Sequence, residues 1–172
     1  MGEHRAYTTK EMNKYVVEKM KERGVCVVDI AKIVHTIQVQ YTPSITVEDC
    51  LPHVNDVLNK RETLYALLTG IALDELAEKQ LLPEPLQYLI ETDEGLFGVD
   101  EILTLSIVNM YGSIGLTTFG YLDQNKMGII HDLDSCKVNS VNTFLDDLVA
   151  GVAAAAASKL AHYQRDLTEK EI

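Results

Sequence analysis

Hydrophobic residues recur at intervals of three and four along most of this 172-residue chain, the spacing of one buried face of an α-helix. A first helix is predicted from a capping signature, Thr8 with Glu11, to Gly24. A second is predicted over 27–40. The β-branched residues at its start would also suit a strand, but no other segment of similar character could pair with it. The pattern therefore favours helices and no sheet.

The middle of the chain continues in the same way. Thr46 and Asp49 form a second capping signature at the start of a third helix. A long helix is predicted from Lys60, and Gly70 inside it costs about 1 kcal/mol relative to alanine. We expect this glycine to mark close packing against a neighbouring helix. A short helix is predicted to start at Pro83 and Pro85 and to end near Glu91.

The last predicted helix contains an unbroken block of alanines at 153–157. Thr143 and Asp146 have the spacing of a capping signature, and the helix is predicted to run to about Arg165, with a frayed, charged tail. Gly151 and the alanines would let other helices approach closely. The sequence thus predicts an all-α, compact single-domain bundle of about six to eight helices around a central alanine-rich C-terminal helix.

The segment 102–122 contains no charged residue and is long enough to cross a bilayer. Its serines, threonines and glycines weaken that interpretation, and Gly112 and Gly115 predict a break into two shorter buried helices. The N-terminus has no apolar core of a secretory signal. We therefore expect a cytoplasmic protein without a transmembrane segment.

Composition excludes several classes of function. The net charge of −11 would repel nucleic acid and anionic membranes. The three cysteines, Cys26, Cys50 and Cys136, form no CxxC pair, which argues against a zinc knuckle or a disulfide framework. The five histidines show no HExxH spacing, and no glycine-rich phosphate loop is present. His131, in a predicted loop beside Asp132 and Asp134, is the one histidine kept as a possible acid or base.

Three acidic groups border or interrupt the apolar helices of the second half of the chain. They are Asp100 with Glu101, Asp123 followed by Lys126, and Asp146 with Asp147. Taken singly, each pair is typical of the first turn of a helix, where carboxylates favour the helix dipole. Carboxylates within apolar sequence are costly unless a cation compensates them, and oxygen ligands suit Mg²⁺. Together the three groups indicate a metal site.

The same residues lie in motifs that resemble a known family, phosphatidylglycerophosphatase A, and more closely its soluble, low-temperature requirement C-like branch. The resemblance covers about 93–160, while 1–92 is similar only to the soluble branch. It implies one family domain over 1–172, with an N-terminal helical part and a motif-bearing core. The motifs are GVDE (98–101), FGYLDQNK (119–126), Asp134 and DDLVAG (146–151).

The resemblance implies a Mg²⁺-dependent phosphate-monoester hydrolase of lipid metabolism, which converts phosphatidylglycerophosphate to phosphatidylglycerol. Its substrate would be a phosphate ester, such as a phospholipid headgroup. Lys126, Asp123 and Asp147 are the implied catalytic residues, Lys126 neutralising the phosphoryl oxygens. The implied ligands of Mg²⁺ or Mn²⁺ are Asp100, Glu101, Asp123, Asp146 and Asp147.

The chain departs from the family pattern at four positions. Gly120 replaces an arginine, Met127 and Ile129 replace two prolines, and a glycine that usually follows the acidic pair is missing around Thr104. Losing the arginine removes a bidentate phosphate clamp that lysine cannot copy. The alternative hypothesis is therefore a non-catalytic metal-binding or structural protein of the same fold. Its apolar run and alanine-rich helix would supply a homo-oligomeric interface.

Overall fold

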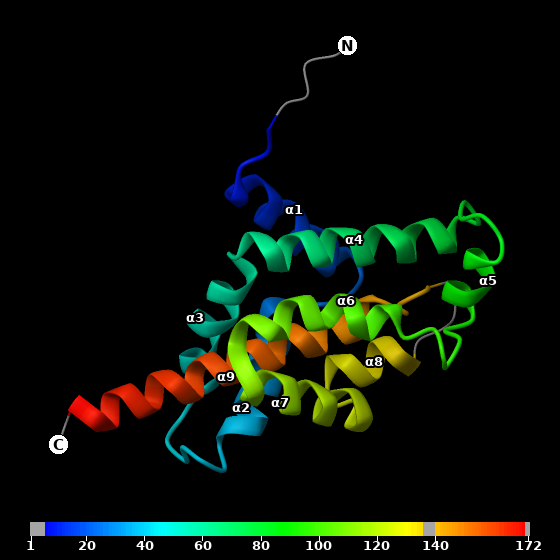
Figure 1. Cartoon of the computed structure of the whole chain (residues 1–172). Coiled ribbons are helices and arrows are strands. Elements are labelled where there is room, and N and C mark those ends of the chain that lie inside the picture. Colours follow the sequence, from blue (N-terminus) through cyan, green and yellow to red (C-terminus); the bar gives the residue numbers. More distant parts are fainter. Residues whose placement is uncertain (1–5, 136–139, 171–172) are drawn as a thin grey trace.

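The computed structural model describes residues 6–135 and 140–170, which form helices and connecting loops without a β-strand (Figure 1). The all-α class predicted from the sequence is confirmed. In chain order the helices are α1 (Thr9–Glu22), α2 (Val27–Gln38), α3 (Val47–Leu58), α4 (Arg61–Glu78), α5 (Leu86–Glu91), α6 (Val99–Val108), the 3₁₀ helix η1 (Asn109–Tyr111), α7 (Gly112–Asn125), α8 (Ile129–Ser135) and α9 (Leu145–Lys170).

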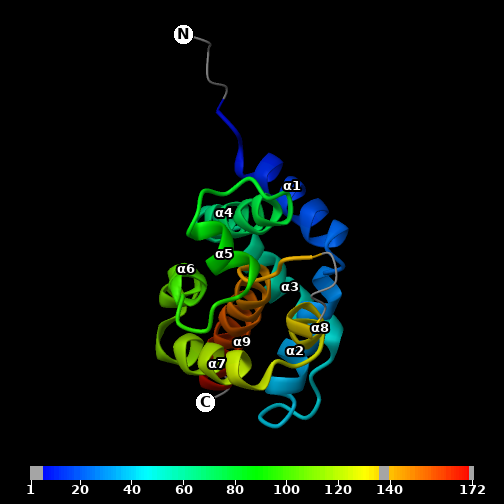
Figure 2. The ribbon, with the colours of Figure 1, turned by 90° about the vertical axis from the view of Figure 1, so that its right-hand side faces the viewer.

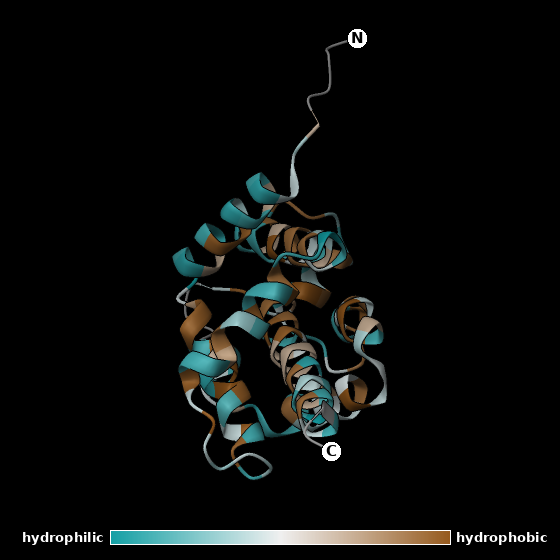
Figure 3. Cartoon of the chain, turned by 90° about the vertical axis from the view of Figure 1, so that its left-hand side faces the viewer, coloured by the Kyte–Doolittle hydropathy of each residue, from teal (hydrophilic) through white to brown (hydrophobic). Residues whose placement is uncertain are grey.

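Helix α9 is the centre of the bundle. It contacts α2, α3, α4, α6, α7 and α8, and its residues from Leu145 to Ser158 are buried. In Figure 3 the middle of α9 is hydrophobic, whereas its C-terminal turns, nearest the viewer, are hydrophilic. Small side chains along this helix let its neighbours approach closely, which a row of leucines would prevent. The central position predicted for the alanine-rich helix is confirmed.

Two glycines mark the closest approaches to α9. A Cβ added to Gly70 of α4 would lie 2.9 Å from Phe144 Cβ and would overlap Leu148. A Cβ added to Gly151 of α9 would overlap the methyl group of Thr104 on α6. The packing role expected of Gly70 is confirmed, and Gly151 has the same role between α9 and α6.

The apolar segment folds back on itself as a helical hairpin. Helices α6 and α7 are joined by η1, and Gly112 (φ +70°) adopts a left-handed backbone at the turn. The predicted break is confirmed at Gly112, whereas Gly115 lies inside α7. Together Val99–Asn125 are long and apolar enough to cross a membrane, yet α6 and α7 are each shorter than a typical span.

The prediction that both helices of this hairpin are buried is wrong. Only 28% of the most apolar part of Val99–Asn125 is buried. Each helix turns one face to α9, and the other face stays open, so that Ile102 is 66% exposed.

The capping signatures of α1 and α3 form as predicted. Thr8 and Glu11 bond reciprocally at 2.9 and 3.2 Å, and Thr46 and Asp49 do the same. These bonds satisfy amides that the first turn of a helix leaves free. The second predicted helix ends at Gln38, two residues early.

The predicted cap of α9 is wrong. Thr143 Oγ1 donates to the carbonyl of Ile90 at 2.6 Å instead of capping the helix. Asp146 Oδ1 accepts from the amide of Asp147. The amides of Phe144 and Leu145 bind the carboxylate of Asp74, a residue of α4 that is distant in sequence.

The far end of α9 also differs from the prediction. The helix continues to Lys170, five residues beyond Arg165. An i,i+4 ion pair, Arg165 Nε to Glu169 Oε1 at 2.8 Å, supports these last turns. Cys26 is exposed and Cys50 buried, and both are free thiols, while Cys136 lies outside the described residues.

Candidate functional site

The three acidic groups identified in the sequence meet at one end of the bundle. Asp100 and Glu101 lie in the first turn of α6, Asp123 lies near the end of α7, and Asp146 and Asp147 lie in the first turn of α9. Figure 2 views this end and shows α6, α7 and α8 around α9. Because α7 runs antiparallel to α6, its C-terminus returns to the level at which α6 and α9 begin.

Asp100, Glu101 and Asp147 form the tightest group. One carboxylate oxygen of each lies within 4.8 Å of those of the other two. Asp100 and Asp147 are buried, and both Asp100 Oδ1 and Glu101 Oε2 are buried without a hydrogen-bond partner. Buried carboxylate oxygens are normally paired because desolvation without a partner is costly. A divalent cation with oxygen ligands would supply the missing partner, so these residues fit such an ion.

Lys126 lies between three carboxylates, and one of them, Asp147, also belongs to the group just described. Its Nζ is 2.9 Å from Asp146 Oδ2 and 3.0 Å from both Asp147 Oδ1 and Asp123 Oδ1. The residue ends α7 in a left-handed conformation (φ +32°), which is uncommon and unfavourable for a lysine. The fold therefore holds this backbone in place while the ammonium group reaches the start of α9.

Burial and crowding of negative charge shift the ionisation of the group. Burial, followed by the neighbouring Glu101 carboxyl group, raises the pKa of Asp100 to about 8. Burial and the charge of Asp146 raise the pKa of Asp147 to about 8, against the opposing charge of Lys126. Burial likewise raises the pKa of Asp146 to about 6. For Lys126, burial lowers the pKa, but Asp146 and Asp147 outweigh it and raise the pKa overall.

All six residues predicted for the site are thus joined in one cluster. Asp147 belongs to both halves, since it neighbours Asp100 and Glu101 and also binds Lys126. Asp123 and Asp146 lie around Lys126 rather than in the three-carboxylate group. The geometry therefore separates a candidate cation position from a lysine-centred ion-pair network.

Two further residues predicted to matter lie elsewhere. His131 is on α8 rather than in a loop, is exposed, and contacts Asp132 and Ser135. Asp134, also on α8, lines a cavity of about 410 Å³ together with Asp93. Thr143 also lines this cavity, three residues before Asp146, so the cavity lies next to the start of α9.

Sequence reasoning gave no role in the site to two buried residues near the cluster. The Thr104 hydroxyl is buried without a hydrogen-bond partner, one turn after Asp100 on the same helix face. Asp74 is fully buried and binds the first amides of α9. In sequence, Asp74 resembles a surface acid next to Glu75, and only the long-range packing of α4 on α9 reveals its role.

The raised carboxyl pKa values predict a specific dependence of stability on pH. Between the ordinary value of 3.8 and about 8, the folded protein binds more protons at Asp100 than the unfolded chain does. The contribution of Asp100 to the free energy of unfolding should therefore fall as pH rises through this window. Urea denaturation of metal-free wild type and Asp100→Asn at pH 5 and pH 8 measures this contribution.

The loss of stability from pH 5 to pH 8 should be smaller in Asp100→Asn, and Mg²⁺ should restore more stability to the wild type at pH 8 than at pH 5. Equal pH slopes in the two proteins would contradict the raised pKa.

Comparison with known proteins places the whole cluster within one family domain. The family model described as phosphatidylglycerophosphatase A matches residues 17–162, which include every residue of the cluster. The uncharacterized protein YpjQ of Bacillus subtilis (strain 168) is 55% identical over 165 residues, covering 96% of this chain and 93% of YpjQ.

Two solved structures are similar along nearly their whole length. The crystal structure of YpjQ from Bacillus subtilis aligns with a TM-score of 0.90 at 56% identity, covering 94% of this chain and 99% of that one. The crystal structure of the low temperature requirement C protein from Listeria monocytogenes aligns with a TM-score of 0.89 at 49% identity, covering 92% and 99%. The resemblance inferred from the motifs, including its low-temperature requirement C-like branch, is confirmed: this chain belongs to the phosphatidylglycerophosphatase A family.

Proposed function

We propose that this protein is a divalent-metal-dependent phosphate-monoester hydrolase. One observation carries the proposal: buried oxygens of Asp100 and Glu101 lack a partner beside Asp147, and Asp147 in turn binds Lys126. A cation site adjoining a fixed ammonium group suits the binding of a phosphoryl group, whose negative oxygens both would attract. Membership of the phosphatidylglycerophosphatase A family supports the same reaction class.

Asp100, Glu101 and Asp147 would hold Mg²⁺ or Mn²⁺ in this proposal. A bound divalent ion polarises a phosphoryl group and makes water a better nucleophile. Lys126 is held beside this position and would neutralise charge that develops on the phosphoryl oxygens. Asp123 is the most exposed carboxylate bound to Lys126, and it is our candidate for accepting a proton from the attacking water.

The surroundings of the acids favour a lipid phosphate such as phosphatidylglycerophosphate. Leu96 is 92% exposed, and Val99 and Ile102 are also exposed immediately before and after Asp100 and Glu101. An apolar rim beside a phosphate site would suit a headgroup that carries acyl chains, because the chains prefer an apolar contact to water. A cytoplasmic protein would then reach the headgroup from the membrane surface, with the apolar rim holding it there against the repulsion between anionic lipids and its net charge of −11.

A second candidate function is metal binding without catalysis. It is favoured by Gly120, where the family pattern has an arginine. Nothing lies within 4 Å of a Cβ built at this glycine, so the space of the missing side chain is open. Without that guanidinium, only Lys126 among the cluster residues would contact the phosphoryl group as a cation.

Metal titration and phosphate release test the two candidates together. Wild type should bind Mg²⁺ or Mn²⁺ by calorimetry and release phosphate from phosphatidylglycerophosphate in detergent micelles. Asp147→Asn removes a carboxylate shared by both halves of the cluster and should weaken metal binding by about 100-fold or more, with loss of turnover. Asp56→Asn, on α3 far from the cluster in sequence, is the control and should change neither.

Each outcome has a distinct meaning. Metal binding without phosphate release would favour the second candidate. If wild type binds no divalent ion, the acids are helix-start residues and the hydrolase proposal fails.

A further inference from the structure

A carboxylate of α4 holds the start of α9. Asp74 Oδ1 accepts the amide of Phe144 at 3.1 Å, and Asp74 Oδ2 accepts the amide of Leu145 at 3.0 Å. Asp74 is completely buried, so water does not compete for these bonds. The first amides of a helix have no partner inside it, and here a side chain from another helix supplies one for each of two successive residues.

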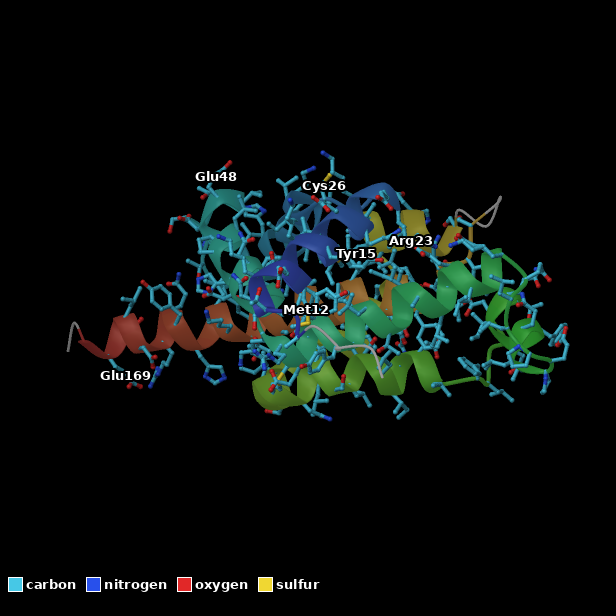
Figure 4. All side chains as sticks on the ribbon, turned by 90° about the horizontal axis from the view of Figure 1, so that it is seen from above. Met12, Tyr15, Arg23, Cys26, Glu48 and Glu169 are labelled. Atoms are coloured by element: carbon cyan, nitrogen blue, oxygen red, sulfur yellow. The ribbon has the colours of Figure 1, made fainter. Side chains whose placement is uncertain are left out.

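A second contact fixes the segment just before α9. Glu78, one turn after Asp74 on α4, accepts the amide of Val141 at 2.8 Å and binds Arg23 at 2.7 Å. Arg23 also donates to the carbonyl of Val141 and, at 2.9 Å, to Asn142 Oδ1. Figure 4 shows Arg23 at the end of α1, beside α8.

These contacts determine where the acids of α9 lie. Asp146 and Asp147 follow directly after the two amides that Asp74 binds. Both acids must meet Lys126 at 2.9 and 3.0 Å, and Asp147 must also reach Asp100 and Glu101. Metal and phosphate sites lose function when a ligand moves by about 1 Å. A helix start free to fray or rotate would not keep two carboxylates within these limits.

We propose that Asp74 is a positioning residue for the acidic cluster, supported by Glu78 and Arg23, and that these residues of the N-terminal half form a clamp on the start of α9. The clamp touches no reacting group, and its effect on metal binding rests on the proposed function. Through the clamp, the N-terminal half positions the acids of α9, which no residue of the motif-bearing core is proposed to do.

The experiment compares Asp74→Asn with Gln38→Leu. An asparagine at position 74 can accept only one of the two amides, because its nitrogen is a donor. Gln38 is the matched control, since its buried Nε2 donates to the carbonyl of Ala157 at 3.2 Å and so also joins a side chain to the α9 backbone, but far from the acids. Urea denaturation, the ¹⁵N resonance of the Lys126 ammonium group and Mg²⁺ or Mn²⁺ affinity are measured for each.

Both variants should lose stability. Only Asp74→Asn should shift the Lys126 resonance and weaken Mg²⁺ or Mn²⁺ binding, by about tenfold or more, the loss expected when a supporting partner of a ligand is removed. If Asp74→Asn does not fold, Glu78→Ala replaces it. This variant removes the acceptor of Val141 and should shift the same resonance to a smaller extent.

The proposal is overturned if the folded variant keeps the wild-type Lys126 resonance and affinity, or if Gln38→Leu changes them equally. If wild type itself binds no Mg²⁺ or Mn²⁺, the hydrolase proposal fails, and the Lys126 resonance alone decides whether the clamp positions the acids.

Discussion

Replacement of Lys126 by methionine should lower the free energy of unfolding of the metal-free protein by about 3 kcal/mol at pH 8. The side chains of Asp146 and Asp147 are only 8% and 4% exposed, and methionine leaves them without their cation. Removing one partner of a buried ion pair costs far more than the pair itself contributes, because the remaining charge stays desolvated. Urea denaturation measures the loss, which should shrink at pH 5, where the two acids can take up protons.

Lys159→Met is the matched control for this prediction. Lys159 is also a lysine with an acidic partner, Asp56, but both side chains are at least a third exposed to solvent. An exposed pair of this kind contributes about 0–1 kcal/mol. Adding Asp147→Asn to Lys126→Met should recover part of the lost stability, because it removes a stranded charge. Equal losses in Lys126→Met and Lys159→Met would show that the cluster is not electrostatically buried.

Gly151→Ala should lower the free energy of unfolding by about 1–3 kcal/mol, although alanine favours a helix by about 1 kcal/mol over glycine. The new Cβ would overlap the Thr104 methyl, which lies on α6 where a β-branched side chain has little rotamer freedom. Either α6 moves away from α9 or Thr104 leaves its rotamer. Urea denaturation measures the loss, and a displacement of α6 should also weaken metal binding, since Asp100 lies one turn before Thr104.

Gly120→Ala is the control for the packing argument. It lies inside α7 with nothing within 4 Å of the added Cβ, so the same substitution should stabilise the protein by about 0.5–1 kcal/mol. Thr104→Ser, which removes the overlapping methyl, should recover most of the loss in Gly151→Ala. If Gly151→Ala and Gly120→Ala change the free energy of unfolding in the same direction, the close contact between α6 and α9 does not determine the effect of alanine at position 151.

Local signals predicted much of this fold. Helical spacing identified the main helices, and the caps at Thr8 and Thr46 depend on bonds within four residues, which a sequence shows directly. The acids of the cluster could also be found from local sequence. Each pair stands out against an apolar background, so their composition alone marked them before their spatial arrangement was known.

The missed features depend on contacts between distant residues. The Thr143 signature has the right spacing, but the Thr143 hydroxyl donates to the distant carbonyl of Ile90, and the amide of Asp146 binds the carbonyl of Asn142. The open face of α6 and α7 was missed because a run of apolar residues does not indicate which face of a helix is buried. Only the packing of the two helices on α9 decides which of their faces is covered. The arrangement of Asp123 and Asp146 around Lys126 likewise depends on how α7 returns to the start of α9.

The burial of α9 has a consequence for dissection and transfer of the site. Residues 93–160 contain the whole acidic cluster, yet α2, α3 and α4, which come before this segment, cover much of α9. A fragment restricted to that segment would expose its alanine face to water and lose Asp74 at the same time. Grafting the motifs onto another scaffold would fail for the same reason. The smallest fragment that could fold and keep the acidic cluster is therefore nearly the entire bundle, even though the proposed site consists of fewer than ten side chains.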